Sequence, residues 1–229
     1  MVDAVEIALP FAGRWLVMNS PARRVPSHGV DLLGQRYAID FVGVDDRHRD
    51  AHSSDWRTLV HTEPPERFVS FGRPILAPAD GVVVAVHDGE PDHEARRSQL
   101  ALVPYMLGQA ARLRQGPAAI AGNHVVLRLR ESGVFAAMVH LRRGSLRVAA
   151  GDTVAVGQQL AACGNSGNST QPHLHVQLMD SADLAVARGV PVLFRGYREW
   201  GAGPGHPPLV DPVFVDSGIP GERSVVEPV

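Results

Sequence analysis

The chain has 229 residues, of which 45% are hydrophobic and 20% are charged, as in ordinary soluble globular proteins. Its formal net charge is −2 and it has no basic run, so nothing in it indicates nucleic-acid binding. No stretch of about 18 consecutive apolar residues occurs, which argues against a membrane span.

The N-terminal stretch 1–15 carries Asp3 and Glu6 where a secretory signal peptide would be basic and then apolar. For the chain as written we therefore expect no signal peptide and a cytoplasmic location. Action outside the cytoplasm would then require export by another route.

Short apolar runs, several of them rich in valine, recur between glycine, proline, asparagine and aspartate residues. This pattern predicts an all-β fold, and we expect residues 1–229 to form a single domain. The expected strands lie within residues 37–44, 81–88, 123–130, 133–141, 152–163 and 172–180.

Three segments depart from the strand pattern. Residues 45–73 are polar and irregular, and a loop of that length is more often functional than idle. A second insertion is expected at about 88–120, and residues 93–114 within it are rich in helix formers, which predicts a short helical insertion. Residues 181–229, rich in proline and glycine, are expected to form a C-terminal extension over the surface.

Two residue types limit the possible chemistry. All 22 basic residues are arginine, so a lysine nucleophile, a Schiff base and a lysine-borne prosthetic group are excluded. The single cysteine, Cys163, cannot form an internal disulfide or a cysteine-rich zinc knuckle, and we interpret it as a small buried residue. Any bound metal must be held by histidine, aspartate or glutamate.

Two histidines, His173 and His175, stand one residue apart in the sequence PHLHVQL. On a strand such residues face the same side of the sheet. An isolated pair of this kind more often lies on a solvent-exposed face than in a metal or catalytic site. Another histidine, His140, ends a second apolar run. A catalytic zinc site needs three protein ligands and an open position for water, and imidazole and carboxylate are both suitable ligands.

The run from Gly151 to His175 (GDTVAVGQQLAACGNSGNSTQPHLH), with VHL at 139–141, resembles the lysostaphin-type zinc metallopeptidases. The resemblance covers about residues 74–88 and 121–179, with a shorter stretch near 36–42. It implies a Zn²⁺ peptidase that cleaves peptides of bacterial cell walls. It also implies a β-sandwich related to the biotinyl/lipoyl hammerhead, the duplicated hybrid motif.

Carried over by position, the resemblance implies that His175 is a zinc ligand and that His173 is the general base or orients the water. It implies that His140 is the second catalytic histidine. The family's other two ligands come from a strand that reads His-x-x-x-Asp. Here Asp40 matches, but Arg36 occupies the histidine position, and arginine stays protonated and cannot bind zinc.

Two ligand pairs remain open for this strand. In the favoured pair, Asp40 binds zinc together with His28, which folds across from a neighbouring segment. In the other pair, His28 and Asp31 bind zinc, which requires a bend because a spacing of three places strand side chains on opposite faces. Smaller departures are Gln171, Gln177 and Met138, where the family often has glycine, glutamate and tyrosine.

The resemblance therefore implies a zinc-dependent endopeptidase that hydrolyses an amide bond in peptidoglycan-type peptides through a zinc-bound water. The departure at Arg36 supports one alternative, a non-hydrolytic metal-binding regulator or binding module on the same fold. The expected partner is a peptide or peptidoglycan substrate, without nucleic acid and without a membrane span. The sequence indicates no oligomeric state.

Overall fold

The computed structural model describes residues 3–52, 61–98, 114, 116–201 and 211–229. Its strands are β1 (Val5–Ala8), β2 (Trp15–Met18), β3 (Ile39–Gly43), β4 (Pro74–Leu76), β5 (Gly81–His87), β6 (Asn123–Leu129), β7 (Phe135–Leu141), β8 (Thr153–Val154), β9 (Gln159–Ala162), β10 (Leu174–Met179), β11 (Gly189–Val190), β12 (Val192–Trp200), β13 (Val213–Gly218) and β14 (Val225–Pro228). Two 3-10 turns, η1 (Gln35–Tyr37) and η2 (Pro65–Arg67), and one short helix, α4 (Pro117–Ala121), complete the described elements.

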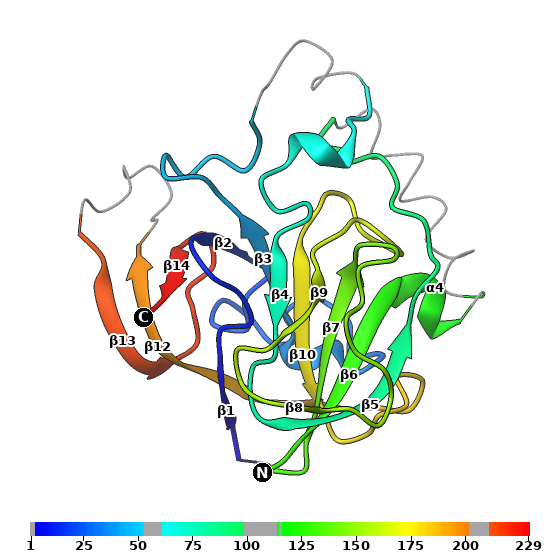
Figure 1. Cartoon of the computed structure of the whole chain (residues 1–229). Coiled ribbons are helices and arrows are strands. Elements are labelled where there is room, and N and C mark those ends of the chain that lie inside the picture. Colours follow the sequence, from blue (N-terminus) through cyan, green and yellow to red (C-terminus); the bar gives the residue numbers. More distant parts are fainter. Residues whose placement is uncertain (1–2, 53–60, 99–113, 115, 202–210) are drawn as a thin grey trace.

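Most strands belong to one large sheet with the order β1-β12-β14-β2-β3-β10-β7-β6-β5-β8 (Figure 1). Strand β11 pairs with β10, strand β13 pairs with β12, and β4 and β9 form a separate two-stranded sheet. Strands β1 and β12 pair in parallel, and the other pairs are antiparallel. The site strands β3, β10 and β7 are therefore adjacent although they are far apart in the chain.

Alternation along the strands separates the two faces of the large sheet. On β3, Ile39 and Phe41 are fully buried in the main core, whereas Asp40 between them faces the other side. The main core also contains Ile75 from β4 and Leu160 from β9, so it lies between the large sheet and the two-stranded sheet. This two-sheet, nearly all-β arrangement confirms the predicted fold class.

Each strand-like run of the sequence contains at least one strand of the structure. The helices expected within residues 93–114 fall mainly on residues 99–113, which lie outside the described part of the chain. The segment 181–229 does more than cover the surface, since its strands β12 and β14 lie inside the large sheet between β1 and β2. Its proline and glycine residues suggested loops, but pairing with distant strands outweighs that local preference.

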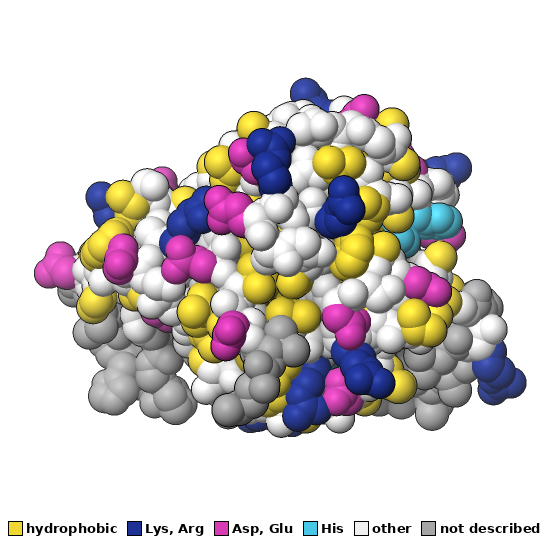
Figure 2. All heavy atoms as spheres, turned by 90° about the horizontal axis from the view of Figure 1, so that it is seen from below, with side chains coloured by type: hydrophobic (Ala, Val, Ile, Leu, Met, Phe, Trp, Pro, Cys, Tyr) yellow, Lys and Arg dark blue, Asp and Glu magenta, His cyan; other side chains and the backbone are white. Residues whose placement is uncertain are grey.

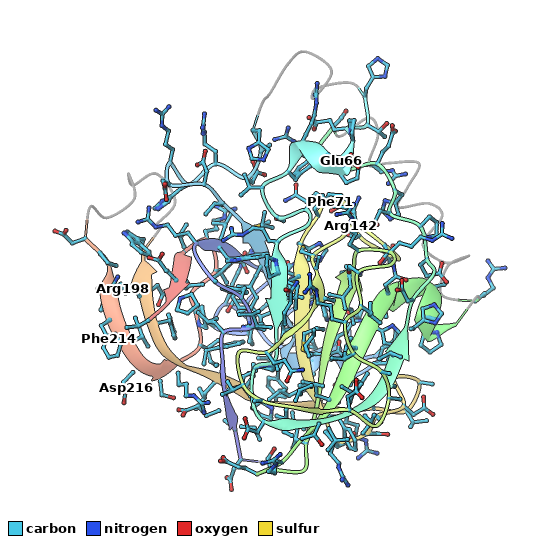
Figure 3. The ribbon with its side chains drawn as sticks, in the orientation of Figure 1. Glu66, Phe71, Arg142, Arg198, Phe214 and Asp216 are labelled. Carbon is cyan, nitrogen blue, oxygen red and sulfur yellow. The ribbon has the colours of Figure 1, made fainter. Side chains whose placement is uncertain are left out.

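The two insertions contact each other at one end of the molecule, where Figure 3 labels Glu66 and Phe71. The buried carboxylate of Glu63 accepts two hydrogen bonds of 2.8 Å from Arg97, one from Nε and one from Nη2. An isolated bridge also joins Glu63 to Ala95. The described parts of residues 45–73 and 88–120 are thus fastened together.

The surface carries mixed charge, in keeping with the small net charge. On the face seen in Figure 2, arginine and acidic side chains are interspersed with apolar ones. In the part of the chain that the structure describes, no helix is long and apolar enough to cross a membrane.

Candidate metal centre

The register of three strands places an acid beside the histidine pair. In the antiparallel pairing of β3 with β10, Asp40 lies opposite His175, and in the pairing of β10 with β7, His175 lies opposite Val139. Directly opposed residues share a face of the sheet, so these three side chains form a row on the face away from the main core. His173, two residues before His175, also reaches Asp40, with its Nε2 at 3.6 Å from Oδ1.

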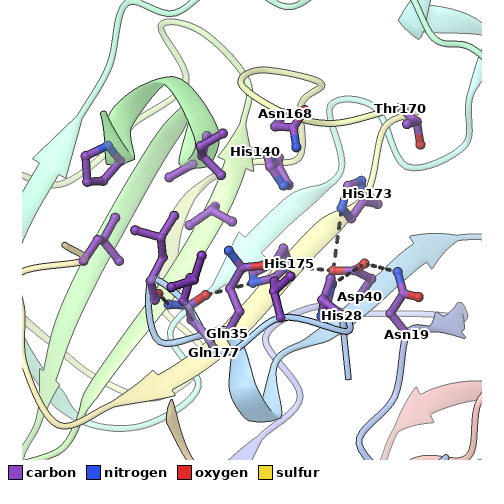
Figure 4. A pocket seen from close by; sticks show the side chains of 18 residues that line it. Asn19, His28, Gln35, Asp40, His140, Asn168, Thr170, His173, His175 and Gln177 are labelled. Atoms are coloured by element: carbon purple, nitrogen blue, oxygen red, sulfur yellow. Dashed lines mark hydrogen bonds and ion pairs between the residues drawn. The ribbon is translucent and has the colours of Figure 1, made fainter. Parts of the chain in front are cut away.

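The carboxylate of Asp40 lies between two imidazoles (Figure 4). His175 Nδ1 is 2.8 Å from Asp40 Oδ1, and His28 Nε2 is 3.0 Å from Asp40 Oδ2. One donor atom from each of the three residues lies within 4.8 Å of the others, and the described residues contain no second group of this kind. The structure thus brings together three of the residues that were predicted to bind metal.

The other ring nitrogen of each imidazole is held by an oxygen. His175 Nε2 is 2.9 Å from Gln177 Oε1, and the Gln177 amide donates to the Leu33 carbonyl at 2.7 Å. His28 Nδ1 is 3.0 Å from the hydroxyl of Ser27. A ring proton on each outer nitrogen, shared with these oxygens, would leave a lone pair for a metal on the nitrogen that faces Asp40.

Two imidazoles and one carboxylate therefore bring one possible ligand atom each within 4.8 Å of one another. Two histidines with one carboxylate form a common protein ligand set of catalytic Zn²⁺. The residues present fit zinc.

Electrostatics keep Asp40 ionised. Burial alone would raise the pKa of its carboxyl group. The charges of His28 and His173 and the hydrogen bond from His175 outweigh burial and hold this pKa well below its usual value. Asn19 adds a hydrogen bond of 2.8 Å from Nδ2 to Asp40 Oδ2.

His173 presents an unprotonated nitrogen beside the candidate ligands. Its Nδ1 lies 2.8 Å from the Gln171 carbonyl oxygen, which can only accept, so Nδ1 carries the proton. Nε2 is then free to take a proton on the side that faces Asp40. The rings of His173 and His140 are neighbours, with centroids 4.7 Å apart.

His140 is held in an uncommon backbone conformation, with φ at +62°. Its Nδ1 donates to the Ser166 carbonyl at 2.9 Å, which leaves Nε2 as an acceptor. Burial, and then the charges of His173 and His175, lower the pKa of His140 well below its usual value. This histidine is therefore neutral at neutral pH.

The alternative acid, Asp31, lies elsewhere. Its carboxylate pairs with the guanidinium of Arg36, and both side chains are about half exposed. The structure therefore brings Asp40 to His28, while Arg36, at the position where the family has a histidine, faces outward.

The sequence offered only weak signals for the supporting residues. Asn19 follows β2 and has a φ of +46°, a left-handed conformation that asparagine tolerates better than most residues. Gln177 lies two residues after His175, and this spacing places both side chains on the same face of β10. Neither signal identifies the partner of the side chain.

Residues 108–191 match the family model described as "Peptidase family M23". This match confirms the resemblance to the lysostaphin-type peptidases.

Solved structures of such peptidases are also similar to this chain. The catalytic domain of lysostaphin from Staphylococcus simulans shares 18% identity, with 78% of this chain and 88% of that chain covered and a TM-score of 0.39. A mutant catalytic domain of the prophage-encoded M23 protein EnpA from Enterococcus faecalis shares 19% identity over 67% and 73%, with a TM-score of 0.38. The deep-sea M23 metalloprotease pseudoalterin shares 14% identity over 93% and 100%, with a TM-score of 0.45. Since these scores are below 0.5, the assignment depends on the family match and on the chain's own geometry.

Proposed function

We propose that this chain, whose residues 108–191 match the M23 peptidase family, is a zinc metalloendopeptidase of that type and hydrolyses an amide bond in peptidoglycan-type peptides at the pocket around Asp40. One observation carries the proposal: His28 and His175 direct their metal-facing nitrogens at the Asp40 carboxylate while an oxygen holds the other nitrogen of each ring.

In this proposal His28, Asp40 and His175 hold the zinc. Zinc held there would act as a Lewis acid and lower the pKa of a bound water to about 7, which would provide a nucleophile at neutral pH. The ionised Asp40 gives the centre its negative charge. Its hydrogen bond from Asn19 keeps the carboxylate in one orientation.

His173 moves the proton. Its Nε2 accepts the proton from the attacking water, and the Gln171 carbonyl, bonded to Nδ1, keeps the ring aimed and stabilises the cation that forms. The same Nε2 then protonates the leaving amine. A base in this position contributes about 10²–10⁴-fold to the rate.

His140 orients the water. Because its Nδ1 donates to Ser166, its Nε2 can accept a hydrogen bond from water but cannot donate one to a developing oxyanion. Its lowered pKa keeps that nitrogen unprotonated at neutral pH.

The test combines metal analysis with mass spectrometry of digests. The zinc-loaded protein is incubated with purified peptidoglycan and with a set of cross-linked peptides, in parallel with a chelator-treated sample to which zinc is later restored. Peptide fragments should appear with zinc, disappear after chelation and return on restoration. Bound zinc with no fragment released would contradict this proposal and favour the non-hydrolytic alternative.

A further inference from the structure

The pocket that holds the candidate ligands has a second, apolar half. The pocket has a volume of about 310 Å³, near the lower end of the range of about 300–1,000 Å³ for small-molecule pockets. In Figure 4 its unlabelled lining side chains gather beside α4, on the other side of His175 from Asp40. The apolar lining comprises chiefly Val30, Leu32, Ile120, Ala121, Val139 and Leu184.

The apolar half begins directly at the candidate metal centre. Val139 is the strand partner of His175, on the side opposite Asp40. Consecutive strand residues normally face opposite sides, yet Val139 and His140 both line the pocket. The positive φ of His140 breaks the alternation and places an aliphatic side chain and a candidate catalytic ring together.

The mouth of this half carries exposed apolar side chains. Val30 is 46% exposed and Leu32 is 58% exposed, and both lie on the loop before η1. This loop is anchored to the site because the Leu33 carbonyl accepts the hydrogen bond from Gln177. Apolar side chains that line a pocket mouth are suited to contact with an apolar ligand group.

The described residues offer no charged partner in the apolar half. Among the described residues that line the pocket, the ionisable ones are Asp40 and the four histidines of the candidate site, and none is an arginine. Asp40 is already engaged by His28, His175 and Asn19. A charged substrate side chain buried there would lose its hydration without gaining a partner, which is strongly unfavourable.

We infer that this apolar half binds the uncharged aliphatic side chain of a residue that flanks the scissile amide. The inference rests on the proposed function and adds the substrate class to it. The enzyme would then prefer a peptide with alanine or leucine beside the cleaved bond over one with glycine, and would disfavour an acidic or basic residue there.

The experiment uses the zinc-loaded full chain and acetylated, amidated pentapeptides in which a central residue is flanked by two glycines on each side. The central residue is glycine, alanine, leucine, glutamate or arginine, each chiral one in L and D form. Mass spectrometry locates the cleaved bond and gives kcat/KM. The better aliphatic peptide should exceed the glycine peptide about tenfold or more, and the charged peptides should fall below it.

Two variants test whether the preference for an aliphatic residue depends on the apolar half of the pocket. Leu32→Ser changes an exposed side chain at the mouth, and Val139→Thr keeps the shape of the side chain while adding a hydroxyl group. Each should reduce the ratio of kcat/KM for the leucine or alanine peptide to that for the glycine peptide by several-fold. The control is Phe214→Ser on β13, where an exposed side chain lies far from the pocket (Figure 3), and this change should leave the ratio unaltered.

The outcomes separate the two proposals. Cleavage at equal rates whatever the central residue, or faster cleavage beside glutamate or arginine, would overturn the aliphatic preference and leave the endopeptidase proposal intact. An unchanged ratio in both pocket variants would overturn the location of the preference. Failure to cleave any of these peptides or peptidoglycan would overturn the proposed function and this inference together.

Discussion

Two groups of histidines lie ring to ring in the described part of this protein, one around Asp40 and one beside Glu90, and only the first is arranged as a candidate metal centre. His28 and His175 have ring centroids 4.8 Å apart beside Asp40. His87 and His124, opposed on β5 and β6, have centroids 5.5 Å apart, and Glu90 approaches His87 Nε2 at 3.2 Å. Both places therefore offer two imidazoles and one carboxylate.

The difference lies in what the carboxylate contacts and how deeply it is buried. The Asp40 side chain is 8% exposed and contacts both imidazoles of its pair, whereas the Glu90 side chain is 40% exposed and contacts one. His124 directs its Nδ1 at the Gly122 carbonyl at 2.7 Å. A metal centre thus requires metal-facing nitrogens that converge on one buried acid, and proximity of suitable residues is not sufficient.

The largest expected effect comes from removing the acid of the first pair. Asp40→Asn should lower zinc affinity by more than the 10–100-fold typical of an outer-shell change and abolish turnover. The matched controls Asp31→Asn and Glu90→Gln should keep full zinc content, measured by elemental analysis after dialysis. Zinc loss in Asp31→Asn, with zinc retained in Asp40→Asn, would show that the other ligand pair operates.

Replacement of the proton carrier should separate binding from chemistry. His173→Gln should reduce kcat by about 10²–10⁴-fold while zinc stays bound at the wild-type ratio. His87→Gln, in the second pair, should change neither quantity. If His173→Gln loses its zinc, then the roles of His173 and His175 are reversed.

Replacing Gln177 should have a smaller effect on zinc affinity, and its size should depend on the replacement. Gln177→Ala frees the His175 ring and should lower zinc affinity about 10–100-fold. Gln177→Glu keeps an acceptor for His175 but cannot donate to Leu33, so its affinity should lie between those of the wild type and the alanine variant. Leaving that carbonyl without its donor should also cost about 1–3 kcal/mol in the free energy of unfolding. Wild-type zinc affinity in both variants would show that the ring is held by other contacts.

The smallest effect concerns pH and the second pair. Burial, and then the charge of His87, lower the pKa of His124 below its usual value of 6.5. Below about pH 6.5 the unfolded chain takes up a proton that the folded chain binds only at lower pH, so acid reduces stability through this residue. His124→Gln should therefore show a smaller loss of unfolding free energy from pH 7 to pH 5, measured by urea denaturation. An equal loss in both proteins would contradict this account.

Several features follow from local sequence alone. Val-rich runs between turn residues predict the strands, because a period of two is a property of each strand by itself. The same period places His173 and His175 on one side, and the structure shows both beside Asp40. Cys163 is fully buried, as its surroundings in the sequence indicated.

Only the tertiary structure decided the rest. Asp40 and His175 are 135 residues apart, and the register of β3 against β10 brings them together. The sequence favoured Asp40 over Asp31 but left both open, and the structure places the Asp40 carboxylate beside His28 and His175. The same non-local pairing places β12 and β14 inside the sheet and Val139 beside His175. The local sequence determined which side of a strand most side chains face. The pairing of the strands decided which residues from different strands become neighbours, because that pairing depends on the whole sheet.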